Sequence, residues 1–129
     1  MSTGHIAIVD DDESVRRAMA RLLGLYSFQV QTYASGDEFL DSLKTRVPSC
    51  LIVDLQMKNE MSGLELLHHL AGMGLSIPTI VMTAQDDPGM RHRCQLAGAV
   101  AFLIKPVMKD SLLKAIRAST PTSTRIEPG

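Results

Sequence analysis

The stretch "CLIVDLQMKNEMSGLELL", from Cys50 to Leu67, contains the pattern that decides the fold. It begins with an apolar run of strand length, and the run ends at a carboxylate, Asp54. A polar loop follows, after which Ser62 and Glu65 have the spacing of a capping box at the start of a helix. The stretch therefore predicts a buried strand, a loop and a helix, with an acidic side chain at the carboxyl end of the strand.

The same unit, a short apolar run followed by a helical pattern, recurs along the chain. The runs are "IAIV" at 6–9, "FQVQTY" at 28–33, "CLIV" at 50–53, "TIVM" at 79–82 and "AFLI" at 101–104. A final helical segment carries Leu112, Leu113 and Ile116. Alternating strands and helices predict an α/β fold, a doubly wound five-stranded parallel sheet of (βα)5 type with the flavodoxin-like strand order 2-1-3-4-5.

Length and charge limit the classes of function. The 129 residues suit one domain, and 13 Lys and Arg against 14 Asp and Glu leave a net charge of -1. We therefore expect no direct nucleic-acid binding by this chain. No apolar run approaches the roughly 18 residues of a membrane span, and the two cysteines lack the spacing of a metal site. These features indicate a soluble cytoplasmic protein.

Further helix starts are marked by capping residues. Ser35 with Glu38 fits a second capping box, and Asp87 before Pro88 places an N-cap ahead of a favoured first-turn proline. The helix after Pro88 has a thin apolar stripe and should pack loosely on the sheet. The stripe consists of Met90, Cys94 and Ala97.

Polar residues follow four of the five predicted strands. In a parallel sheet of this type the carboxyl ends of the strands meet at one edge, where ligands bind. Part of the acidic run after the first strand serves to cap the next helix, since an Asp and a first-turn Glu are favoured there. The residues expected at the edge are Asp10, Asp11, Asp54, Thr83 and Lys105.

These side chains have the composition of a metal and phosphoryl site. Three converging carboxylates raise one another's pKa unless a cation is bound, and Mg²⁺ suits an open site with oxygen ligands. Thr83 and Lys105 supply a hydroxyl and a cation for phosphoryl oxygens, and Asp54 then becomes the nucleophile. Lys105 could instead be an ion-pair partner of the acids, which is compatible with phosphate binding once the site is filled.

The motifs "VDDDE", "LIVDLQM", "MSGLELL", "MTA" and "GAVAFLIKP", in this order and spacing, resemble the receiver domain of bacterial two-component response regulators, in the CheY-like superfamily. The resemblance covers roughly residues 5–118. It implies a receiver domain over 1–118, and the Ser-, Thr- and Pro-rich segment 119–129 is expected to be a flexible tail or the start of a linker.

The resemblance implies a role for each acidic residue. Asp54 would accept a phosphoryl group from a sensor histidine kinase, a phosphotransfer protein or a small acyl phosphate. Mg²⁺ would be held by Asp10, Asp11 and Asp54, together with the backbone carbonyl of Gln56. The protein would be a signalling switch rather than an enzyme, with intrinsic autophosphorylation and autodephosphorylation activity.

The resemblance also implies a switch. Thr83 and Lys105 would bind the phosphoryl oxygens, and the Lys105–Pro106 peptide bond would be cis. Phe102 would be the switch aromatic that follows Thr83, although a phenylalanine in a strand is often a plain core residue. Phosphorylation would change the face formed by the fourth helix, fifth strand and fifth helix for a partner, a homodimer or an output domain.

The loop after Asp54 departs from the family pattern. Met57 is followed by Lys58 where the family usually has proline, and Gly63 comes one residue late. Lys58 and Glu60 are either solvated turn residues, or Lys58 folds over the acids and partly replaces Mg²⁺.

Two glutamines stand near the predicted site. Gln56 and Gln85 lie two residues beyond Asp54 and Thr83, and we hypothesise that their side chains tune the lifetime of the phosphorylated state.

The sequence is also compatible with two other functions. The altered loop could have left a phosphorylation-independent interaction module. The run "DDDES" also fits the D-x-D-x-S motif of aspartyl-phosphate phosphatases, although such enzymes generally need a longer chain.

Overall fold

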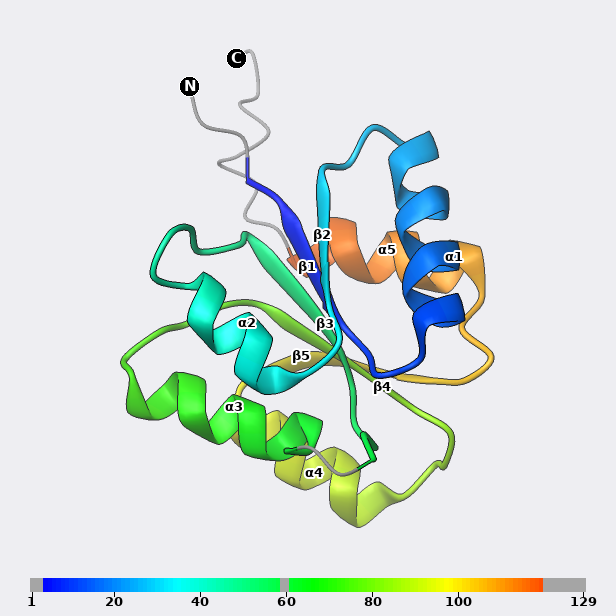
Figure 1. Cartoon of the computed structure of the whole chain (residues 1–129). Coiled ribbons are helices and arrows are strands. Elements are labelled where there is room, and N and C mark those ends of the chain that lie inside the picture. Colours follow the sequence, from blue (N-terminus) through cyan, green and yellow to red (C-terminus); the bar gives the residue numbers. More distant parts are fainter. Residues whose placement is uncertain (1–3, 59–60, 120–129) are drawn as a thin grey trace, which may run out of the picture.

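The computed structural model describes residues 4–58 and 61–119, and it contains a five-stranded parallel sheet with helices on both faces (Figure 1). The strands are β1 (Ile6–Val9), β2 (Val30–Tyr33), β3 (Cys50–Asp54), β4 (Thr79–Thr83) and β5 (Ala99–Ile104). The helices are α1 (Glu13–Leu25), α2 (Gly36–Ser42), α3 (Gly63–Gly72), α4 (Pro88–Leu96) and α5 (Lys109–Ser119). The strand order is β2-β1-β3-β4-β5, so the predicted fold class and topology are confirmed. Of the predicted tail over 119–129, only Ser119 belongs to the described residues.

Two strands begin at a different residue from the one predicted, and β3 and β4 each extend one residue further than predicted. The second strand begins at Val30 rather than at Phe28, because the Phe28 amide donates to the Leu23 carbonyl at the end of α1. The fifth strand begins two residues earlier than predicted, and its pairing with β4 shifts by one residue after Ala99. The residue at this irregularity, Val100, is 56% exposed.

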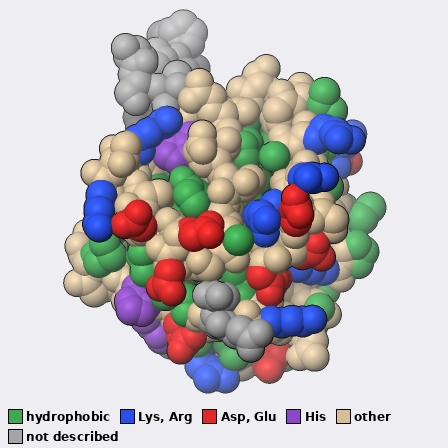
Figure 2. Space-filling model, viewed as in Figure 1, with side chains coloured by type: hydrophobic (Ala, Val, Ile, Leu, Met, Phe, Trp, Pro, Cys, Tyr) green, Lys and Arg blue, Asp and Glu red, His purple; other side chains and the backbone are tan. Residues whose placement is uncertain are grey.

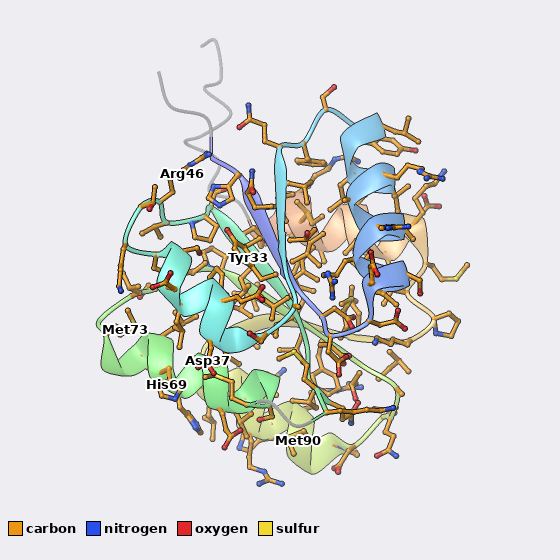
Figure 3. All side chains as sticks on the ribbon, viewed as in Figure 1. Tyr33, Asp37, Arg46, His69, Met73 and Met90 are labelled. Atoms are coloured by element: carbon orange, nitrogen blue, oxygen red, sulfur yellow. The ribbon has the colours of Figure 1, made fainter. Side chains whose placement is uncertain are left out.

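The strands alternate their side chains between two apolar layers. Helices α1 and α5 cover one face of the sheet, while α2, α3 and α4 cover the other (Figure 1). The first layer contains Ile8, Ile52, Met19, Leu23 and Ile116, all buried. The second contains Val9, Val53, Val81, Phe39 and Leu66, and Tyr33 (Figure 3) packs its ring edge-on against Phe39 with centroids 5.5 Å apart. Because both faces are covered, the central strands are mostly apolar, as their sequence predicts.

Capping residues fix where the helices begin. Asp12 caps α1, since its carboxylate accepts hydrogen bonds from the Ser14 and Val15 amides at 2.9 and 3.4 Å. These bonds hold the pKa of Asp12 below its usual range, beginning with the bond from the Ser14 hydroxyl. The acidic run is thus divided: Asp12 serves the helix and Asp10 and Asp11 are available to a site.

The other predicted caps differ in completeness. Ser62 and Glu65 form a full capping box at α3, as predicted. At α2 the box is partial, because the Glu38 carboxylate accepts from the Ala34 amide instead of from Ser35. At α4, Asp87 is the N-cap and Pro88 the first helical residue, as predicted.

Helix α4 is loosely packed, as its thin apolar stripe predicts. Cys94 is its one buried residue, while Met90 (Figure 3) and Ala97 are half-buried. At its end, Leu96 is 75% exposed. Few buried side chains hold this helix, so it can shift at low cost relative to the sheet.

The surface carries no dominant charge. Acidic side chains lie among Lys and Arg on the face viewed in Figure 2, in agreement with the net charge of -1. Both cysteines are buried and free. None of the described helices combines the length and the apolar composition needed to cross a bilayer.

Candidate functional site

Three carboxylates converge where β1 and β3 end. These strands pair side by side, with Val9 opposite Val53, so the residues that follow them come together at the same edge. Each of the three carboxylates offers an oxygen, and these oxygens lie within 4.8 Å of one another. Asp10 and Asp54 are buried, while Asp11 is exposed. The acids that the sequence places at this edge are Asp10, Asp11 and Asp54.

Asp10 is the most buried of the acids, with no exposed surface. Its Oδ1 accepts a hydrogen bond from the Asp12 amide at 2.9 Å, but its Oδ2 has no hydrogen-bond donor among the described residues. Burial raises the pKa of Asp10, and the negative charges of Asp54 and Asp11 raise it further. A buried carboxylate oxygen without a donor is a costly group, and a cation at this point would remove the cost.

Lys105 reaches the acids from the end of β5. Its Nζ donates to Asp54 Oδ2 at 3.1 Å and lies 3.6 Å from Asp10 Oδ2. Burial lowers the pKa of Lys105, but the hydrogen bond to Asp54 and the charges of both acids outweigh this, so the pKa lies above its usual value. The lysine is therefore a cation that is held at the site by ion pairs. The Lys105–Pro106 peptide bond is cis.

Asp54 lies at the centre of the edge. Its Oδ1 accepts a hydrogen bond from the Gln56 amide at 3.2 Å, and its Oδ2 accepts the one from Lys105. Its side chain is buried apart from a small exposed fraction of 7%. An anchored carboxylate between a cation and two further acids suits a nucleophile whose attack needs a fixed orientation.

The Thr83 side chain is hydrogen-bonded to the side chain of Gln56, a residue expected from the sequence to tune the lifetime of the phosphorylated state. The Thr83 hydroxyl donates to Gln56 Oε1 at 3.1 Å, and the same oxygen accepts from the Ala84 amide at 3.4 Å. The Gln85 amide donates to Thr83 Oγ1 at 3.2 Å, so Gln85 contacts Thr83 through its backbone. Gln56 thus connects the loop after β3 with the loop after β4.

The loop after β3 contacts the acids through its backbone. The Lys58 amide donates to Asp11 Oδ2 at 2.9 Å, and the residue is exposed. Proline could not make this bond, so the departure from the family pattern supplies a donor. Lys58 thus contacts Asp11 through its backbone amide. Glu60 lies outside the described residues.

Gly63 closes the same loop. A Cβ atom at this position would lie 3.0 Å from the Asp54 carbonyl oxygen and 3.1 Å from the Leu55 Cα. The Gly63 amide donates to the Leu55 carbonyl at 3.0 Å. Glycine therefore lets the start of α3 pack directly against the end of β3, which fixes the strand end that carries Asp54.

Phe102 lies beside the site rather than in it. It is half-buried, it packs against the apolar layer under α4, and it pairs across the sheet with Val81. The Arg91 guanidinium lies over its ring, with Cζ 5.2 Å from the ring centroid. This contact was not expected from the sequence, because Arg91 and Phe102 come from different elements.

Arg16 also makes a contact at the site that was not expected from the sequence. Its Nη1 donates to the backbone carbonyl of Asp10 at 2.7 Å, which ties α1 to the end of β1. Its position one helical turn after the cap Asp12 is a local signal, since that spacing turns a side chain back toward the start of the helix.

The donor set fits a hard divalent cation. All three candidate side-chain ligands are carboxylates, as Mg²⁺ prefers. Among the described residues, Asp10 Oδ2 accepts no hydrogen bond and has the Lys105 ion pair at 3.6 Å.

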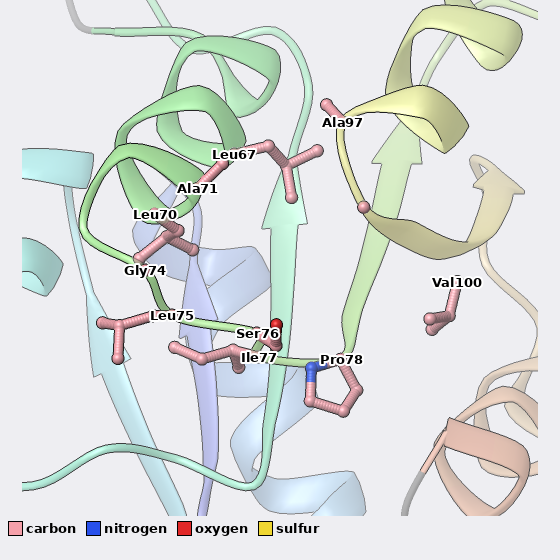
Figure 4. A pocket seen from close by; sticks show the side chains of 11 residues that line it. Leu67, Leu70, Ala71, Gly74, Leu75, Ser76, Ile77, Pro78, Ala97 and Val100 are labelled. Carbon is pink, nitrogen blue, oxygen red and sulfur yellow. The ribbon is translucent and has the colours of Figure 1, made fainter.

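One cavity lies next to the site, and another lies away from it. One of about 460 Å³ lies next to the site, lined by Gln56, Thr83, Gln85 and Met90 among others. The other, of about 450 Å³, is apolar and lies where α3 ends and β4 begins, lined by Leu70, Ile77 and Pro78 among others (Figure 4). The second cavity is at the opposite end of β4 from Thr83 and takes no part in the site.

Comparisons with known proteins agree with this geometry. A model of the response regulator receiver domain family matches residues 6–117. The response regulator protein TodT of Pseudomonas putida is 37% identical over 114 residues, which cover 88% of this chain and 50% of TodT. The transcriptional regulatory protein FixJ of Rhizobium meliloti is 36% identical over 120 residues, which cover 93% of this chain and 58% of FixJ. The chain thus spans about half the length of these relatives.

Solved structures give the same result. The crystal structure of FixJ-N superimposes with a TM-score of 0.84 at 33% identity, covering 98% of both chains. The structure of the response regulator StyR gives a TM-score of 0.82 at 35% identity, covering 92% of this chain and 60% of that one.

Proposed function

The chain belongs to the response regulator receiver domain family of two-component systems, and we propose that Asp54 is its phosphoacceptor. The observation that carries the proposal is the convergence of Asp54 with Lys105, at 3.1 Å, and with Asp10 and Asp11 within 4.8 Å. The donor would be the phosphohistidine of a sensor kinase or of a phosphotransfer protein, or a small acyl phosphate.

Each residue has a part in the transfer. Asp54 is held by the Gln56 amide and attacks phosphorus with its carboxylate oxygen, while the bond from phosphorus to the donor breaks. Lys105 moves from the carboxylate to a phosphoryl oxygen, whose developing charge it stabilises. Asp10, Asp11, Asp54 and the backbone carbonyl of Gln56 would hold Mg²⁺, which neutralises charge on the phosphoryl group when bound.

Thr83 is the link between the transfer and the response. Its hydroxyl is engaged with Gln56, so it must exchange this acceptor for a phosphoryl oxygen. We infer that Phe102 follows this change and that the face formed by α4, β5 and α5 then alters for its partner. The same residues would catalyse autophosphorylation and autodephosphorylation, with Gln56 beside the attacking water.

We assign the receiver domain to residues 1–118 and expect a linker or tail beyond it. An output domain or a homodimer is the expected recipient of the signal, and the chain spans only about half the length of its relatives. This exchange would take place in the cytoplasm, and the buried free cysteines agree with a reducing compartment.

Two observations weigh against the other functions. An interaction module without phosphorylation would not require the costly burial of Asp10 and Asp54 beside a lysine. A phosphatase using "DDDES" would need a nucleophile in that run, yet Asp12 is engaged as a helix cap and Asp10 has a raised pKa, mainly from burial.

Intact-mass spectrometry after incubation with acetyl phosphate and Mg²⁺ tests the proposal. The wild type is expected to gain one phosphate, released by hydroxylamine as an acyl phosphate, and Asp54→Asn is expected to gain none. Asp37→Asn, an exposed acid on α2, is the matched control and should behave as the wild type. A wild type that gains no phosphate would favour the interaction module.

A further inference from the structure

Arg91 connects two parts of the molecule that the phosphorylation response has to couple. Its Nη2 lies 2.6 Å from Asp86 Oδ1, in the loop between Thr83 and α4. The guanidinium also covers the Phe102 ring on β5 at 5.2 Å. A cation over an aromatic face within about 6 Å of its centroid is attracted to it. One side chain thus contacts both the loop that follows Thr83 and the aromatic residue of the proposed switch.

The chain of contacts from Thr83 to Phe102 is continuous. The Gln85 amide donates to Thr83 Oγ1, and Asp86 is the next residue. If Thr83 turns to a new acceptor, this amide must follow or lose its bond, and Asp86 moves with it. Arg91 is then drawn away from Phe102 or from Asp86.

Phe102 lies where such a movement can reach it. Its partner in β4, Val81, is two residues before Thr83, so Phe102 and Thr83 lie on the same face of the sheet. The ring is half-buried against the apolar layer beneath α4. The helix that carries Arg91 has one buried residue, Cys94, which leaves it free to shift.

The contacts of Arg91 are weak enough to break. The side chains of Arg91 and Asp86 are 42% and 63% exposed, so water and salt screen their ion pair. Arg91 Nε is buried and has no hydrogen-bond partner among the described residues, which lowers the cost of moving the guanidinium.

We propose that Arg91 is a positioning residue that clamps Phe102 in its half-exposed position, tethered by Asp86 to the loop after Thr83. The clamp opposes the rearrangement that phosphorylation requires. This inference rests on the proposed function, because it assumes that Thr83 moves when Asp54 is phosphorylated. Since coupling is reciprocal, loosening the clamp favours the conformation that accepts the phosphoryl group.

Fluorescence tests the clamp in the unphosphorylated protein. The sequence has no tryptophan, so Phe102→Trp introduces a single indole. Adding Arg91→Ala is expected to make the indole less accessible to acrylamide, because the released ring turns inward. Arg91→Lys should restore most of the quenching seen in Phe102→Trp alone, and Asp86→Asn or high salt should act in the direction of Arg91→Ala. Quenching that rises or stays constant in Arg91→Ala would show that Arg91 only covers the ring, and would overturn the proposal.

Phosphorylation kinetics test the coupling with Phe102 in place. Arg91→Ala is expected to be phosphorylated by acetyl phosphate about 2- to 5-fold faster than the wild type, the range of an exposed cation–π contact. Arg93→Ala, an exposed arginine of the same helix, is the matched control and should show the wild-type rate. In a Phe102→Ala background the Arg91 effect should vanish.

The outcomes distinguish the two proposals. An Arg91→Ala effect that is absent, or that persists without Phe102, would overturn the clamp while Asp54 remains the phosphoacceptor. A wild type that is never phosphorylated would overturn the proposed function, and the quenching measurement would still decide whether Arg91 clamps the ring.

Discussion

The two sides of the proposed site are built differently. On the β1 and β3 side, Asp10 and Asp54 are buried and joined to Lys105 by ion pairs of 3.6 and 3.1 Å. On the α4 side, Arg91 is half-exposed and contacts Asp86 and Phe102 only through screened interactions. Under the proposed function, phosphoryl transfer would use the fixed groups, whereas the response would use contacts that can exchange at low cost.

Lys105→Ala should have the largest effect on the fixed side. Removing a preorganised donor for developing charge lowers a rate by about 100-fold or more, so phosphorylation by acetyl phosphate should slow by about that factor. Lys109→Ala, which removes a lysine on α5 that lies over the Tyr26 ring, is the control and should keep the wild-type rate. A Lys105→Ala rate equal to that of the wild type would mean that the ion pairs are structural only.

Asp10→Asn tests whether the buried acids lower the stability of the fold when no metal is added. Burial raises the pKa of Asp10 above 3.8, so the folded chain binds this proton more tightly than the unfolded chain. The stability that this provides is full below pH 3.8 and is lost as the pH rises through the folded-state pKa.

Asn cannot ionise, and it keeps an oxygen for the Asp12 amide. Without Mg²⁺ at neutral pH, Asp10→Asn should therefore raise the free energy of unfolding by on the order of 1 kcal/mol. Urea unfolding should show this gain in stability at neutral pH and its disappearance in acid. Added Mg²⁺ should stabilise the wild type but not Asp10→Asn. A variant that is less stable than the wild type at neutral pH without Mg²⁺ would contradict the account.

Gln56→Ala sharpens the comparison at the boundary between the two sides. The Gln56 side chain accepts a hydrogen bond from the Thr83 hydroxyl, whereas Gln85 donates to Thr83 Oγ1 from its backbone amide. Gln56→Ala should therefore change the autodephosphorylation rate by about 5-fold, the effect of about one hydrogen bond, and Gln85→Ala should change it less. Decay of the phosphorylated mass species provides the rates. Unchanged decay in both variants would remove the glutamines from the mechanism.

The smallest expected effects concern Lys58. Lys58→Ala keeps the amide that donates to Asp11, so its Mg²⁺ affinity, measured by calorimetry, should equal that of the wild type. Lys58→Pro lacks the donor and should lose up to about 1 kcal/mol of stability in urea unfolding without Mg²⁺. A changed affinity in Lys58→Ala would instead support the lysine side chain as a partial substitute for the metal.

The fold was largely predictable from the sequence, because strands with both faces covered are continuous apolar runs. The runs at 6–9, 50–53 and 79–82 lie within β1, β3 and β4. The start of β2 was not predictable, because the Phe28 amide donates a hydrogen bond to the end of α1. A pattern of apolar residues does not reveal this contact. The irregularity at Val100 likewise has no signal in a run of apolar residues.

The site was predictable where it depends on strand order alone. Once β1, β3 and β5 are in order, Asp10, Asp54 and Lys105 must meet at one edge. The contacts of Lys58 with Asp11 and of Arg91 with Phe102 depend on where loops and helices come to rest. Such contacts join residues that no local pattern relates, so the structure was needed to find them.

Locating the phosphate tests the central claim most directly. After incubation with acetyl phosphate and Mg²⁺, borohydride reduction converts a phosphorylated aspartate to homoserine, which peptide mass spectrometry assigns to a position. The account predicts homoserine at position 54 alone, and none when EDTA replaces Mg²⁺. Homoserine at position 10 or 11, or at no position, would contradict it.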